Sequence, residues 1–183
     1  MKRSVLIVWL LALAVPCLAF GQAQAAKPPK PGPEHQKLAA LLGAWTTQGE
    51  ARESPFGPAD KWSGTIKSEW WAGHFAVVRH LEEQSSVRGE SRSLDVLTYD
   101  ATAKGYTWFY LDSQGGSGLA KGTIAGDALT VVFDVPVDGK VYKLRGTLKG
   151  LGADTLTWDA EYSEDGKAWK AFSHSTDTRV KAR

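Results

Sequence analysis

The sequence predicts an all-β fold, namely a single antiparallel barrel of roughly ten strands preceded by one short helix. Apolar and polar residues alternate with a period of two over most of the chain beyond Gly43, which is typical of strands with one buried and one solvated face. Turns rich in Gly and Asp separate these segments at even spacing. A sheet of so many strands can remove its exposed edges by closing into a barrel.

The first element along the chain is an export signal, which we assign to residues 1–25. Two basic residues precede an apolar run from Val5 to Val15, Pro16 ends the run, and Ala23-Gln24-Ala25 provides small residues for cleavage. The run is shorter than the roughly 20 residues that span a bilayer, so we expect a cleaved signal and no stable membrane anchor. The expected destination is the periplasm or the extracellular medium.

Removal of the signal changes the chemistry of the mature chain. Cys17, the only cysteine, lies inside the signal, and Pro16 before it argues against lipidation. The mature protein then has no thiol, which excludes disulfides, thiolate zinc sites and cysteine nucleophiles. Two of the 22 Lys and Arg also leave, so 20 basic residues face 20 acidic ones. A formally neutral domain gives no reason to expect nucleic acid or an anionic membrane as a partner.

A Pro-rich leader follows at residues 26–33, and one barrel domain is expected over residues 34–183. The domain begins with a helix at residues 34–42, whose leucines share one face and which Gly43 ends. His35 is expected to be exposed on this helix. A flat sandwich is the alternative architecture, but the helix favours a barrel because it can plug one end.

The predicted strands are joined by hairpin turns. Val137-Asp138-Gly139-Lys140 and Glu164-Asp165-Gly166-Lys167 both carry the Asp-Gly pair that favours tight turns. The strands are expected at residues 44–52, 61–71, 74–83, 91–100, 106–112, 117–124, 128–136, 140–149, 155–163 and 168–179. Consecutive hairpins of this kind indicate an antiparallel meander.

The segment Leu41-Leu42-Gly43-Ala44-Trp45 resembles the Gly-x-Trp start of lipocalin-like (calycin) barrels. In that superfamily the Trp closes the bottom of the barrel and an Arg late in the last strand packs over it, so the resemblance implies Trp45 and Arg179 as a barrel-closing pair. An ordinary core Trp beside a solvated Arg is the alternative. Three further runs resemble a bacterial branch of exported lipocalin-like proteins of unknown function. These runs are Trp70-Trp71-Ala72-Gly73-His74-Phe75, Tyr99-Asp100 and Trp108 to Asp112.

A barrel of this size can hold one small apolar molecule. The residues expected to form the pocket wall face inward and are mostly aromatic: Trp62, Trp70, Arg79, Tyr142, Trp158 and Tyr162. Arg79 interrupts an apolar strand face, so it needs a carboxylate partner, an anionic ligand or a position at the rim. A completely filled core is the alternative to a pocket.

His174, within Ser173-His174-Ser175, raises the question of a cofactor. Haem barrels of the nitrobindin type resemble this layout, with a Gly-x-Trp first strand and an axial His near the C-terminus. The glycine-rich spacing that follows the Trp in those barrels is missing here. We therefore expect no cofactor, with His174 as a haem ligand kept as an alternative. No metal site is expected, because zinc and calcium spacings are absent.

No catalytic pattern emerges from the sequence. Glu82 and Glu83, for example, are adjacent charges expected at a loop edge and not an opposed acid and base. The predicted function is therefore binding of a small apolar or amphipathic molecule by an exported barrel, through the end opposite Trp45, between loops 53–60 and 84–90. The alternatives are a barrel for haem or nitrogen oxides and a closed barrel that acts as an interaction module.

Overall fold

The structure, a computed structural model, describes residues 29–181. The expected export signal and the first part of the leader lie outside the described residues. The strands are β1 (Gly43–Ala51), β2 (Asp60–Trp70), β3 (Ala76–Ser85), β4 (Gly89–Asp100), β5 (Gly105–Asp112), β6 (Ser117–Ala125), β7 (Ala128–Val137), β8 (Lys140–Lys149), β9 (Thr155–Ser163) and β10 (Lys170–Arg179).

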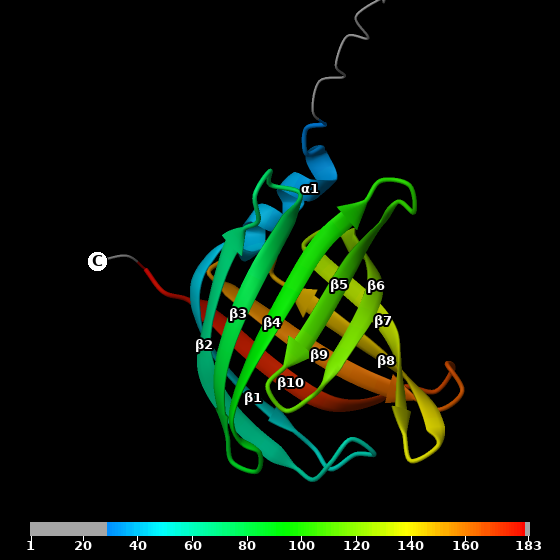
Figure 1. Ribbon diagram of the computed structural model, residues 1–183. Helices are drawn as coiled ribbons and strands as arrows, with labels where there is room; N and C mark the ends of the chain where they lie inside the picture. Colours follow the sequence, from blue (N-terminus) through cyan, green and yellow to red (C-terminus); the bar gives the residue numbers. More distant parts are fainter. Residues whose placement is uncertain (1–28, 182–183) are drawn as a thin grey trace, which may run out of the picture.

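The strands close into one antiparallel barrel, in which each strand pairs with its chain neighbours and β1 pairs with β10 (Figure 1). The predicted all-β barrel is confirmed, and the flat sandwich is excluded. Each strand begins and ends within two residues of its predicted position. The prediction succeeded because a period of two both defines a strand and decides which of its faces is buried.

The predicted helix is shorter and tighter than expected. The α-helix α1 spans Pro33–Lys37, and the chain continues as a 3₁₀ helix over Leu38–Leu41. The two helices lie over one end of the barrel (Figure 1), and Leu38 and Leu41 are both buried there. No helix within residues 29–181 is long and apolar enough to cross a membrane.

The expectation that His35 is exposed was wrong. Its side chain is buried, and its ring packs edge-on against Phe75 and Tyr99, with ring centroids 5.1 and 5.6 Å apart. A polar residue on a short surface helix usually faces solvent, but α1 contacts the end of the barrel, so this residue is enclosed by the rings below it. The hydrogen bond from the backbone N–H of Gly32 to its Nδ1 (3.2 Å) satisfies one polar atom.

The apolar core gathers beneath the helices, at what we call the closed end. Its buried members are Leu38, Leu41, Trp45, Ile66, Val77, Leu97, Tyr106, Ala120, Leu129, Val131, Leu148 and Leu156. Trp45 is 1% exposed, and its indole donates to the Leu41 carbonyl (3.0 Å). The structure brings Arg179 over this ring, with Cζ 4.0 Å from the ring centroid. The guanidinium also donates to the carbonyls of Leu42 (2.6 Å) and Ala40 (3.2 Å), and so ties the helices to the last strand.

Candidate functional site

Three adjoining cavities lead from the opposite end, which we call the open end, toward the middle of the barrel. The mouth cavity, of about 310 Å³, is lined by residues of the loop 52–59 and the hairpin 86–88. It shares Trp62, Arg88 and Ser173 with a central cavity of about 200 Å³. The central cavity shares four wall residues with an inner cavity of about 170 Å³, namely Leu81, Asp95, Trp108 and Trp158. Because neighbouring cavities share wall residues, we treat the three as one continuous series.

A larger hollow of about 780 Å³ lies outside the barrel, on β1, β2, β3 and β10. It is open to solvent, and exposed polar side chains such as Gln48, Glu50 and Lys61 line it. Because it is open to solvent, this hollow would enclose little of a ligand's surface, so we place the candidate site in the interior series and not in this hollow.

A buried ion-pair cluster occupies the wall of the central cavity. Arg79 on β3 is 4% exposed, and its Nη2 donates to Oδ2 of Asp177 on β10 (3.3 Å). Its Nη1 lies 3.8 Å from Oδ2 of Asp95 on β4, and its Cζ lies 5.6 Å from the ring centroid of Trp108. Of the three alternatives that the sequence left for Arg79, the structure shows the carboxylate partner inside the barrel.

The interior holds more acid than base. Glu83 lies on the same inward face of β3 as Arg79 and also lines the central cavity, where it adds a third carboxyl group. Burial raises the pKa of Glu83, and the nearby Asp177 and Asp95 raise it further, against the opposing effects of Arg88 and Arg79. Burial also raises the pKa of Asp95, although Arg79 and the Trp108 indole oppose this. The expectation that Glu83 is a loop-edge charge was therefore wrong.

Aromatic rings form most of the remaining wall of the central and inner cavities. Trp108 on β5 and Trp158 on β9 meet with ring centroids 5.3 Å apart. Trp158 lies directly over Gly146, where an added Cβ would come within 1.8 Å of the ring. Trp62 lies over Gly49 in the same way, at 2.4 Å. Each glycine therefore provides the space that lets a large flat ring lie against the barrel wall.

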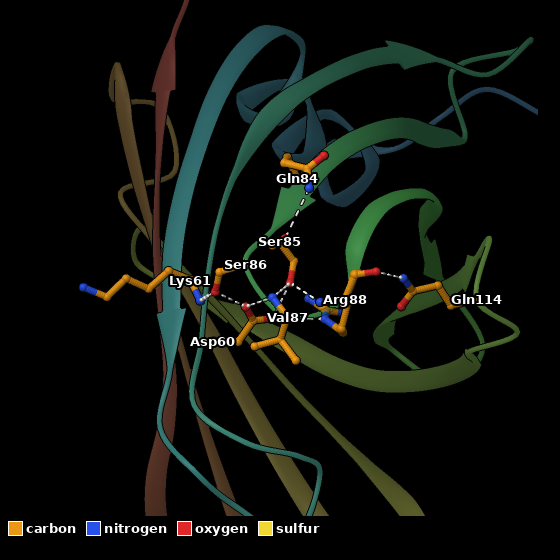
Figure 2. A network of polar contacts seen from close by, with 8 residues as sticks. All are labelled: Asp60, Lys61, Gln84, Ser85, Ser86, Val87, Arg88 and Gln114. Atoms are coloured by element: carbon orange, nitrogen blue, oxygen red, sulfur yellow. Dashed lines mark hydrogen bonds and ion pairs between the residues drawn. The ribbon is translucent and has the colours of Figure 1, made fainter.

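One side of the open end is held by a polar network around Asp60, the first residue of β2 (Figure 2). Its carboxylate accepts hydrogen bonds from Ser85 Oγ (2.6 Å), Ser86 Oγ (2.9 Å) and Arg88 Nε (3.2 Å). Burial by itself raises the pKa of Asp60, but these donors outweigh it and lower the pKa to about 2. The hairpin between β3 and β4 is thereby fixed to β2.

The other side of the open end is covered by the loop 52–59 and is held by aromatic contact. Ser54 and Gly57 exchange two backbone hydrogen bonds (3.0 and 3.1 Å), and this tight turn presents Phe56 to the barrel. The Phe56 ring lies 5.1 Å from that of Phe172 and 5.6 Å from those of Tyr142 and Tyr162. Phe56 therefore forms part of the wall of the mouth cavity and joins it to this group of rings.

The structure divides the predicted pocket wall into three groups. Trp62, Arg79 and Trp158 line the central cavity. Tyr142 and Tyr162 lie in the aromatic contact with Phe56 at the mouth and line neither the central nor the inner cavity. Trp70 packs against the core at the closed end, stacked on His74 with centroids 5.3 Å apart, and lines none of the three cavities.

His174 lies on the outer face of β10. Its side chain is 53% exposed, and its Nδ1 lies 2.8 Å from Oδ1 of Asp159. The structure therefore does not bring His174 into the interior with the other candidate residues. Within residues 29–181, no three His, Cys, Asp or Glu side chains are grouped so that they could hold a metal ion.

Four interior residues were missed by the sequence reasoning, namely Glu83, Asp95, Trp108 and Asp177. Each lies on the inward face of its strand, so the period of two contains a signal for its position. Asp177 follows Ser175 on that face, and Asp95 lies between Ser93 and Leu97. Burial was expected mainly for apolar residues, and the acidic residues were overlooked for that reason.

Comparison with known proteins places this fold among described barrels. A solved structure of Rv2717c from M. tuberculosis matches with a TM-score of 0.57 and 13% identity, over 83% of this chain and 100% of that one. The S-type phycobiliprotein lyase CPES from Guillardia theta matches with a TM-score of 0.52 and 14% identity, over 82% and 94%. These likenesses show the fold. No curated protein sequence matches significantly.

A family model matches residues 30–179, which include both helices and all ten strands. The match therefore spans the whole barrel, including the interior site and the residues at both ends. The chain belongs to the family described as "Protein of unknown function (DUF1579)".

Proposed function

We propose that this protein binds one small apolar or amphipathic molecule inside its barrel, in the central and inner cavities. The observation that carries the proposal is the series of three adjoining cavities, which runs from the open end to a polar centre with aromatic walls. Ligand sites are commonly concave and mostly apolar, with a few polar groups that fix orientation. The Trp108 and Trp158 rings supply the apolar surface, and the Arg79 cluster supplies the polar groups.

The size of the cavities indicates a compact ligand. The central and inner cavities, of about 200 and 170 Å³, together reach only the lower part of the range of roughly 300–1,000 Å³ that is common for ligand sites. A molecule of one or two fused rings would occupy them. A long acyl chain or a large macrocycle would need to extend through the mouth cavity and displace Phe56.

The route into the site follows the unequal construction of the open end. The hairpin beyond β3 is held by charged hydrogen bonds to Asp60, whereas the Phe56 side chain is held by ring contacts and its turn by hydrogen bonds within the loop. The loop 52–59 is thus the side that moves to admit a ligand, and the closed end remains sealed by Trp45 and Arg179.

We further propose that the protein is exported, which rests on the sequence of residues 1–25. The haem alternative gains no support from the geometry, because the His174 imidazole is outside the barrel.

Native mass spectrometry of the protein purified from its own host tests both proposals at once. We expect a polypeptide that begins at Ala26 and carries one additional small molecule, which is released on unfolding.

A variant whose inner cavity is filled by a larger side chain sharpens the result. Ser93→Phe places a ring in the inner cavity, whereas Leu94→Phe places the same ring on the outer face of the same strand. Ser93→Phe should lose the bound mass and Leu94→Phe should keep it. A wild-type protein with no additional mass, or equal binding by both variants, would contradict the binding proposal.

A further inference from the structure

The charged groups in the central and inner cavities do not balance. Among the described residues that line them, Asp95, Asp177 and Glu83 are acidic, and Arg79 lies among them with 4% exposure. Arg88 also reaches the central cavity and acts on Glu83, but its Nε is bound to Asp60 and its side chain is 48% exposed, so it offsets only part of the interior negative charge. One buried guanidinium therefore faces three carboxyl groups.

Arg79, the buried cation of the central cavity, is also already paired with carboxylates. Arg79 contacts Asp177 at 3.3 Å and Asp95 at 3.8 Å, so an anionic ligand would have to compete with two fixed carboxylates. Its Nε is buried and has no hydrogen-bond partner within the described residues. A buried donor without a partner costs free energy, and the ion pairs of the same guanidinium with Asp177 and Asp95 offset that cost.

The excess of acid must be neutralised in one of two ways, by protons or by a cation. Burial of an unpaired carboxylate is costly, and the raised pKa values of Asp95 and Glu83 are the expression of that cost. Within the described residues, Glu83 has no hydrogen bond or ion pair through its carboxylate. An ammonium group in the central cavity would supply the missing positive charge.

We propose that the molecule taken up by this site is an organic cation, a protonated amine carried on a flat apolar body. The inference rests on the proposed function and names the ligand class for the same cavities. The ammonium group lies in the central cavity near Glu83 and Asp95. The apolar body lies against Trp108 and Trp158 and extends into the inner cavity toward Phe133.

The aromatic walls fit the same ligand class. Trp108 and Trp158 border both cavities, and a cation beside a Trp face is attracted by the negative charge of the ring. The attraction is greater where the cation is removed from water. Acidic groups and indole faces thus favour a positive ligand together, whereas an anionic one would be opposed by both.

The test uses three indoles of nearly equal shape, measured by isothermal titration calorimetry at pH 7.5: tryptamine (cationic), 3-ethylindole (neutral) and indole-3-propionate (anionic). We expect tryptamine to bind at least about tenfold more tightly than either of the others, which corresponds to about 1.4 kcal/mol. Glu83→Gln should weaken tryptamine binding about tenfold and leave 3-ethylindole unchanged. Glu82→Gln is the matched control, since Glu82 is the adjacent, exposed residue of β3, and it should change neither affinity.

Three outcomes overturn the inference. If 3-ethylindole or indole-3-propionate binds as tightly as tryptamine, the cavity has no preference for a cation, although the proposed function stands. If Glu83→Gln and Glu82→Gln behave alike, the interior carboxylate has no role in recognition. If none of the three indoles binds, this ligand class is wrong, and the native mass spectrum decides separately whether the barrel binds anything. The ranking of the three indoles on the wild-type protein needs no variant to fold.

Discussion

At the closed end of the barrel the inward residues are apolar and fill the interior, with Trp45 and Leu41 each 1% exposed. At the open end the same strands turn charged and aromatic residues inward and leave cavities of about 200 and 170 Å³. The alternation of the sequence is equally regular in both halves, so the difference comes from which residues occupy the inward positions. The difference teaches that one continuous sheet can enclose a filled core at one end and cavities at the other.

Substitution of Trp45 at the closed end should have the largest effect on the stability of the protein. Trp45→Ala removes a fully buried ring, together with its hydrogen bond to Leu41 and its contact with Arg179, and should lower the free energy of unfolding by about 3–5 kcal/mol. Urea denaturation followed by circular dichroism measures this. Trp62→Ala at the open end is the control, and it should cost clearly less because Trp62 borders two cavities. Equal losses would break the comparison between the two ends.

Substitution of Arg79, the buried arginine inside the barrel, should have the next largest effect on stability. Arg79→Met leaves Asp95 and Asp177 without their partner, and we expect a loss of about 3 kcal/mol at pH 7. The variant should regain stability as the pH is lowered toward 5. The pKa of Asp95 is already raised by burial, so the folded state takes up a proton before the unfolded state does, and acidification favours folding. Equilibrium denaturation at a series of pH values checks this, and a loss that does not vary with pH would contradict it.

The polar network around Asp60 at the open end should contribute least to stability. Its pH dependence should be opposite to that of the Arg79→Met variant. The pKa of Asp60 is lowered to about 2, so its ionised form stabilises the folded state above the unfolded pKa of 3.8, and this stability is lost as the pH falls toward 2. Solvent near the rim screens the effect, and Asp60→Asn should therefore cost about 1–2 kcal/mol at pH 7. Thermal unfolding of both proteins from pH 7 to pH 2 should show the difference vanish at the acid end. A constant difference would mean that the hydrogen-bonded carboxylate is not its source.

The barrel was predictable from the sequence because strand patterns and turns are local signals. Trp45 and Arg179 were also placed together, through a resemblance whose residues lie at the two ends of the domain. Arg79 was expected inside, since its neighbours on the strand face are apolar. Its partner Asp177 is 98 residues away, and only the closure of β1 on β10 brings it across the barrel.

The rest of the site depends on features that no short pattern expresses. The inward direction of Trp70 was predicted, but its height along the barrel was not, and height decides whether an inward residue meets the cavities or the core. Gly49 and Gly146 provide space for Trp62 and Trp158, but a glycine within a strand can equally mark a bulge. The burial of His35 follows from where the helix lies, which the helix sequence alone does not determine.

The pairing of β1 with β10 joins the two ends of the barrel domain. Every other strand pairs with a chain neighbour across a short connection, whereas Arg179 meets Leu42 across 137 residues. Contacts of such sequence separation form late, because the chain between them must first be ordered. The closed end, although it contains most of the core, can be sealed only after the last strand has been synthesised. Before β10 pairs with β1, the other strands can form at most an open sheet with two free edges, and Trp45 lacks the cover that Arg179 gives it in the closed barrel.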